Sequence, residues 1–324
     1  MIFLSIVKTD IPMTAALCRE TIAALRERFP FLRTRILGTT AYGRPLQALI
    51  LGQGERRVLY TAAHHANEWI TAPVLLGFAE ELARASEAGG RIYGVPAETI
   101  LDAATVYLVP MVDPDGVDLV TGGLDSGSPE YARARLLGAG YPEIPFPQGW
   151  KANLLGVDLN LQYPAGWLRA REIKFSQGYT RPGPRDYVGR APLGQRESRI
   201  LAEFTREVDP CLVLAYHTQG REIYWQFGDI FVPGAEEMGR EFARLSGYRL
   251  ARVPGESAYA GYKDWFIREF RRPGFTIEAG LGENPLPLSQ FGEIYRDNLG
   301  ILVTAATGLP GSRQSTSSGP SATA

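Results

Sequence analysis

Hydrophobic residues recur along the chain with two different spacings. Between residues 14 and 29 they fall three or four positions apart, which predicts an amphipathic helix that Pro30 ends. Further on, short aliphatic runs alternate with helical patterns, an order typical of an α/β sheet covered by helices. The predicted strands are residues 45–51, 58–63, 106–112, 211–216, 222–227 and 274–277, and the predicted helices are residues 70–85, 195–208, 235–245, 263–271 and 289–304.

Two segments show neither spacing. Residues 114–153 are crowded with glycine, proline and serine, so we expect a long loop there, and such a loop in a compact domain usually serves function. Residues 311–324 offer nothing to bury and are expected to form a disordered tail. The 324 residues contain no internal repeat, and we expect one domain that includes residues 1–38 as an N-terminal helix and lead-in.

The composition narrows the function classes. Hydrophobic residues make up 45% and charged residues 21% of the chain, values typical of a soluble protein with a large core. The net charge is −1 with both signs scattered, so we expect neither nucleic acid nor a membrane as partner. The apolar start is too short for a signal peptide, and we expect a cytoplasmic location. Cys18 and Cys211 stand in unrelated contexts and predict neither a disulfide nor a cysteine metal site.

The candidate chemistry lies at the carboxyl ends of predicted strands. The chain has three histidines, His64, His65 and His217, and each follows an apolar strand-like run. Glu278 follows the run 274–277 in the same way. Because α/β sheets bind ligands beyond the carboxyl ends of their strands, we expect these side chains to meet at one edge.

A hydrolytic zinc site uses three nitrogen or carboxylate ligands and leaves one position open for water. His65 and Glu68 stand one helical turn apart and His217 can close the set, whereas the adjacent His64 points to the opposite face. The alternative is a polar loop in which Asn67 or Glu68 caps a helix, together with an ordinary histidine at a strand end. Glu278 is the candidate catalytic base. The alternative is that its carboxylate forms a salt bridge to an arginine.

Five short segments contain polar residues of this kind in a fixed order. They are His65-Ala-Asn-Glu-Trp-Ile-Thr71, Asp113-Pro-Asp-Gly116, Gly156-Val-Asp-Leu-Asn160, His217-Thr-Gln-Gly220 and Phe275-Thr-Ile-Glu278. In order and spacing they resemble the zinc carboxypeptidases of the M14 peptidase family. The resemblance covers residues 39–310, which we expect to be the zinc peptidase domain. It implies an eight-stranded, mixed and mostly parallel sheet flanked by helices, one zinc ion on the three ligands and Glu278 as the base.

The sequence departs from the exopeptidases of that family where they use arginine to bind the terminal carboxylate of the substrate. These positions hold Asn67, Lys151 and Leu161 here, although arginine is abundant elsewhere in the chain. Lys151 can stabilise negative charge on an attacked carbonyl, and the neighbouring Asn160 can still donate a hydrogen bond to substrate. The expected substrate-binding residues are therefore Asn67, Asn160 and Leu161.

This combination is similar to the γ-D-glutamyl-meso-diaminopimelate peptidases, a subgroup that cuts murein stem peptides. The resemblance implies a zinc peptidase acting on soluble murein peptides through a water molecule that Glu278 deprotonates. One alternative is a general metallocarboxypeptidase, which requires another arginine, such as Arg169, Arg221 or Arg268, in the specificity pocket. A catalytically silent peptide-binding module is the other alternative.

The family also places a tyrosine from a mobile loop over the substrate. Tyr259 is the best match in this sequence and is the third expected catalytic residue beside Glu278 and Lys151. Tyr262 is the competing candidate, for which packing in the core is the alternative interpretation.

Overall fold

Eight strands form one mixed sheet in the computed structural model, which describes residues 5–309. The strands are β1 (Arg33–Thr39), β2 (Pro45–Leu51), β3 (Arg56–Thr61), β6 (Ala104–Val109), β7 (Leu212–His217), β8 (Glu222–Tyr224), β9 (Arg249–Ala251) and β10 (Gly274–Glu278). Their order is β1-β2-β6-β3-β7-β10-β8-β9, and the four central strands β6, β3, β7 and β10 run parallel. The predicted fold class is confirmed. A separate hairpin pairs β4 (Arg91–Ile92) with β5 (Val95–Pro96).

Alternating side chains of the central strands enter two separate cores, one on each face of the sheet. On β3, Val58 and Tyr60 join one hydrophobic cluster, whereas Leu59 between them joins the other. All three side chains are fully buried. Helices cover both faces, so a parallel strand buried on both sides reads as the continuous apolar run seen in the sequence.

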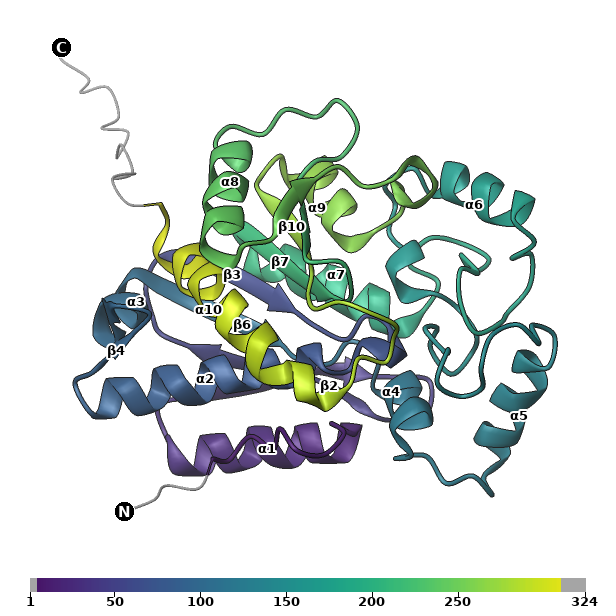
Figure 1. Ribbon diagram of the computed structural model, residues 1–324, viewed down its shortest axis with the longest axis horizontal. Coiled ribbons are helices and arrows are strands. Elements are labelled where there is room, and N and C mark those ends of the chain that lie inside the picture. Colours follow the sequence, from purple (N-terminus) through teal and green to yellow (C-terminus); the bar gives the residue numbers. More distant parts are fainter. Residues whose placement is uncertain (1–4, 310–324) are drawn as a thin grey trace, which may run out of the picture.

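Ten helices surround the sheet in the described part of the chain (Figure 1). The first begins at the cap Thr14, whose hydroxyl accepts a hydrogen bond from the Leu17 backbone N–H at 3.1 Å. The five other predicted helices are also present, within a few residues of their expected ends. The helices are α1 (Ala15–Arg28), α2 (Thr71–Glu87), α3 (Ala97–Ala103), α4 (Pro114–Thr121), α5 (Pro129–Gly138), α6 (Trp167–Ser176), α7 (Arg196–Val208), α8 (Ala235–Ser246), α9 (Tyr262–Phe270) and α10 (Phe291–Thr307).

The prediction of one long loop over residues 114–153 was wrong, because the segment contains α4 and α5. Each helix starts with a capping residue followed by proline: Asp113 accepts from the Gly116 N–H, and Ser128 accepts from the Tyr131 N–H. Proline at the first helical position has no N–H to lose there, so it starts a helix rather than breaking one. The predicted tail at residues 311–324 lies outside the described residues.

The carboxyl ends of β3, β7 and β10 meet at one edge of the sheet, since these strands are parallel and adjacent. Residues 122–190, which include α5 and α6 and are drawn in teal, gather on one side of the sheet (Figure 1). Among the described residues, no helix is both long enough and apolar enough to cross a bilayer.

Candidate metal centre and active site

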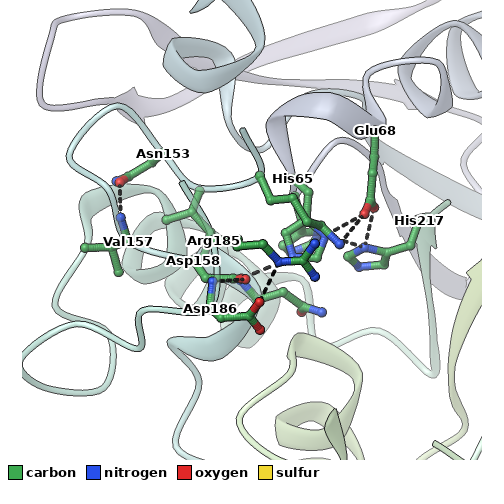
Figure 2. A network of polar contacts seen from close by, with 12 residues as sticks. His65, Glu68, Asn153, Val157, Asp158, Arg185, Asp186 and His217 are labelled. Atoms are coloured by element: carbon green, nitrogen blue, oxygen red, sulfur yellow. Dashed lines mark hydrogen bonds and ion pairs between the residues drawn. The ribbon is translucent and has the colours of Figure 1, made fainter. Parts of the chain in front are cut away.

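The three predicted metal ligands converge on one point. The Nδ1 atom of His65 lies 2.9 Å from Oε1 of Glu68, and the Nδ1 atom of His217 lies 2.9 Å from Oε2 of the same carboxylate. The two Nδ1 atoms are 3.2 Å apart, and Figure 2 shows the three side chains pointing toward one another. All three residues are buried, with exposed fractions of 8% or less.

Local backbone structure brings His65 and Glu68 together. The chain leaves β3, turns at Ala63 with φ of 47° and enters a short 3-10 turn, Ala66–Glu68, just before α2. Neither this turn nor α2 has a side-chain cap, so the capping role considered for Asn67 or Glu68 does not occur. His217 arrives from the last position of β7.

The cluster fits a divalent metal ion. With the His65 proton assigned to Nε2, where Asp158 accepts it, the Nδ1 lone pair faces both a carboxylate and a second imidazole nitrogen. Acceptors crowded in this way need a cation between them. Ligands about 2.0–2.2 Å from a tetrahedral zinc ion lie about 3.3–3.6 Å apart, so a small opening of the observed 2.9–3.2 Å separations would admit the ion.

Asp158 was missed as a functional residue by the sequence reasoning, although it stands two residues before Asn160 in a quoted motif. Its Oδ1 atom lies 3.1 Å from Nε2 of His65, on the side of the ring that faces away from Glu68. Such a carboxylate fixes the orientation and tautomer of a ligating histidine and increases its basicity. Burial alone would raise the pKa of Asp158, but the hydrogen bond with His65 and the nearby cations Lys151 and Lys174 hold it below its usual range.

Glu278 lies beside His217 across the sheet. The two residues are register partners on the parallel strands β10 and β7, so their side chains project on the same side. Burial and the nearby Glu68 carboxylate raise the pKa of Glu278 to about 8. No described arginine pairs with it, and a cation on the three ligands would lower its pKa again, as expected of a base active near neutral pH.

Lys151 reaches the same centre from the segment before Asp158. Its Nζ atom lies 2.8 Å from Oε1 of Glu68, and its carbonyl accepts the Ala66 N–H at 3.1 Å. The lysine is thereby tied to the turn that carries the ligands through both its backbone and its side chain. Lys151 therefore places a positive charge beside the carboxylate ligand.

A cavity of about 600 Å³ opens above this centre. The predicted substrate-binding residues Asn67, Asn160 and Leu161 all line it, together with Lys151 and Glu278. Asn67 is 4% exposed and its Oδ1 atom has no hydrogen-bond partner among the described residues, which leaves a buried acceptor for a ligand.

The two candidate tyrosines do not line this cavity. Tyr259 packs beside Gly166 and edge-on to Phe227. Tyr262 is fully buried, and its hydroxyl lies 2.8 Å from the Thr205 hydroxyl. His64 is likewise outside the cluster, with Nε2 3.3 Å from the Tyr163 hydroxyl, as the opposite-face argument predicts.

None of the three arginines considered for the specificity pocket lines the cavity. Arg169 pairs with Glu172 on its own helix, Arg221 pairs with residues of α10, and Arg268 donates to the Pro164 carbonyl. A different arginine, Arg185, does line it. The sequence offered little signal for this residue, because it lies in a proline- and glycine-rich loop far from the predicted strand ends.

Metal-dependent hydrolases bind their ion with two histidines and a glutamate and keep an open cavity above it. The fold and the site therefore define this chain as a metal-dependent hydrolase. A sequence profile of the zinc carboxypeptidase family matches residues 18–300. The chain belongs to this family and is a zinc-dependent peptidase by class.

Known relatives agree in sequence and in structure. The gamma-D-glutamyl-L-diamino acid endopeptidase 1 of Lysinibacillus sphaericus is 42% identical over 282 residues, covering 87% of this chain and 69% of the relative. Thrombin activatable fibrinolysis inhibitor superposes with a TM-score of 0.74 at 16% identity, covering 94% of this chain and 77% of that one. Carboxypeptidase A from Helicoverpa armigera gives 0.68 at 16% identity, with 94% and 75% covered. At such identities the two structures show the shared fold alone.

Proposed function

We propose that this chain hydrolyses the amide bond between the γ-carboxyl group of D-glutamate and a diamino acid, meso-diaminopimelate above all, in soluble murein peptides. The observation that carries the proposal is the composition of the cavity above the metal centre, where Asn67, Lys151 and Leu161 replace the arginines of the exopeptidases. The 42% identity to an endopeptidase named for that bond supports it.

His65, Glu68 and His217 would hold one zinc ion. Such an ion polarises the substrate carbonyl and makes a water molecule more acidic. Asp158 holds His65 in the orientation that presents Nδ1 to the centre. The backbone N–H of Thr218 donates to Glu68 Oε2 at 3.2 Å and steadies the carboxylate ligand.

Glu278 acts as the base and then as the acid. Its carboxylate takes a proton from the attacking water and passes it to the nitrogen of the leaving amine, so that one water molecule is added across the amide bond. Lys151 stabilises the negative charge that develops on the carbonyl oxygen. Asn67 and Asn160 line the cavity as hydrogen-bonding groups, and Leu161 supplies an apolar contact.

Mass spectrometry of one reaction tests the proposal. The zinc-loaded protein is incubated with L-Ala-γ-D-Glu-meso-diaminopimelate, and we expect L-Ala-D-Glu and free diaminopimelate as products. Absence of both products, with the peptide intact, would contradict the proposed function. If the protein bound the peptide without cutting it, the alternative of a catalytically silent binding module would hold.

A general metallocarboxypeptidase is the second candidate, and the presence of Arg185 in the cavity favours it. An exopeptidase binds the free carboxylate at the end of its substrate, usually through an arginine. Conversion of that carboxylate to an amide would therefore abolish exopeptidase activity. We expect the γ-D-glutamyl bond to be cut in the amidated peptide as well when that peptide is supplied at saturating concentration.

A further inference from the structure

We infer that Arg185 is a specificity-determining residue that binds a carboxylate of the substrate through its two terminal nitrogens; this inference rests on the proposed function. Arg185 lines the same cavity as Lys151 and Glu278. Figure 2 shows its side chain beside Asp158, the residue that holds His65. Arg185 thus enters the cavity from a segment other than those that carry Asn67, Lys151 and Leu161.

The guanidinium of Arg185 is anchored by one nitrogen only. Its Nε donates to Oδ2 of Asp186 at 2.6 Å, and neither terminal nitrogen has a hydrogen-bond partner among the described residues. The side chain is 41% exposed, so these nitrogens are accessible from the cavity. Two parallel N–H groups on a fixed plane are the geometry that binds a carboxylate with two hydrogen bonds.

The anchor of Arg185 is itself held in place. Asp186 Oδ1 lies 2.6 Å from Nζ of Lys174, whose side chain is 8% exposed, and the Asp186 backbone N–H donates to Asp158 Oδ2 at 3.4 Å. Asp186 also adopts φ of 62°, a left-handed conformation that is uncommon for a residue other than glycine. The loop therefore presents Arg185 from a fixed support linked to the holder of His65.

The carboxylates nearest Arg185 leave its terminal nitrogens free. Asp186 pairs with Lys174 and with Nε of Arg185, while Asp158 contacts His65 and the Asp186 backbone. No described carboxylate accepts a hydrogen bond from the two terminal nitrogens, so an anionic group of the substrate would be their acceptor.

The proposed substrate has a suitable carboxylate in two places. A γ-linked D-glutamate keeps its α-carboxylate free, and three carbon atoms separate that group from the attacked carbonyl carbon. The diamino acid on the other side of the bond carries carboxylates of its own. The same guanidinium chemistry would bind either group, and amidation of one group at a time separates them.

Calorimetry on the zinc-loaded Glu278→Gln protein provides the test, because this variant hydrolyses the peptides too slowly to disturb a binding measurement. We expect Arg185→Gln to weaken binding of L-Ala-γ-D-Glu-meso-diaminopimelate about 10- to 100-fold. The control Arg190→Gln, an exposed arginine of the same loop that does not line the cavity, should bind like the parent. Arg185→Lys should fall between the two, since lysine keeps the charge without the planar fork.

Amidated peptides identify the carboxylate. If Arg185 binds the D-glutamate carboxylate, the peptide amidated at that group (the isoglutamine peptide) should bind the parent and Arg185→Gln proteins with equal affinity. If Arg185 binds a diaminopimelate carboxylate, the peptide amidated on diaminopimelate should bind the two proteins with equal affinity. An equal loss on every peptide, no loss on any, or no binding by the parent would overturn the inference. Hydrolysis by the wild-type protein is measured separately, so failure of the proposed function is seen independently of the Arg185 result.

Discussion

The imidazole of His65 is held by Asp158, whose Oδ1 atom lies 3.1 Å from Nε2, while the opposite ring nitrogen faces Glu68. This contact links the metal centre to the loop that carries Asp186, because Asp158 Oδ2 accepts the Asp186 N–H. The Asp158 carboxylate therefore fixes both the orientation of His65 and the position of the loop that lines the cavity.

Replacement of Asp158 by Asn should weaken zinc binding about 10- to 100-fold, because an amide is a poorer acceptor for the His65 proton. Titration against a competing chelator measures the dissociation constant. The surface change Asp125→Asn serves as the control for loss of one negative charge. Equal zinc affinity in all three proteins would remove Asp158 from this role.

Replacement of Glu278 by Gln should lower kcat by a factor of about 10² to 10⁴ and leave zinc bound, since Gln cannot take the proton from water. Steady-state kinetics and metal analysis on the same preparation check both parts. Glu283→Gln removes a carboxylate from the wall of the same cavity and should keep most of the activity. A Glu278→Gln enzyme with near wild-type kcat would show that another group acts as the base.

Replacement of His217 by Ala should abolish stable zinc binding, leaving about one-tenth of the wild-type content or less after dialysis. Loss of one of three ligands leaves too few donors to compete with water. His64→Gln alters the adjacent, stacked ring, whose nitrogens lie outside the cluster, and should retain zinc. Full zinc content in His217→Ala would refute the ligand assignment.

Glu197 predicts a pH-dependent change in stability away from the metal centre. It is 1% exposed, and burial raises its pKa to about 7 from an ordinary value of 4.5. The folded protein therefore binds a proton more tightly than the unfolded chain, so this group's contribution to stability falls as pH rises from about 4.5 to 7. The loss is complete above pH 7.

Glu197→Gln should remove that loss, because the amide stays neutral. We expect the free energy of unfolding at pH 8 to rise by about 1–3 kcal/mol, with little change at pH 4.5. Urea unfolding at the two pH values measures the difference, and the exposed Glu203→Gln on the same helix is the control. An identical effect at both pH values would contradict the assignment.

The sequence predicts the site residues that stand at the carboxyl ends of strands. With only three histidines in the chain, the apolar runs before His65 and His217 placed both at one sheet edge, and Glu278 followed from the same rule. The sheet itself was predictable because its central strands are buried on both faces and leave continuous apolar runs.

The residues that the sequence did not predict reach the site from loops. Arg185 and Asp158 belong to segments whose paths depend on tertiary contacts, such as the Lys174–Asp186 ion pair, that no local pattern encodes. Glycine and proline over residues 114–153 predict a loop, but Pro114 and Pro129 follow capping residues and start α4 and α5. The resemblance predicts Tyr259 at the substrate, whereas its ring lies outside the cavity lining.

Two isomeric substrates show which amide bond fits above the metal centre. L-Ala-D-Glu-meso-diaminopimelate is prepared with the scissile bond on either the γ- or the α-carboxyl of D-glutamate, and kcat/KM is measured for the zinc-loaded enzyme. We predict a preference of about 100-fold or more for the γ-linked isomer. Equal rates, or faster hydrolysis of the α-linked isomer, would exclude a site specific for the γ-D-glutamyl bond.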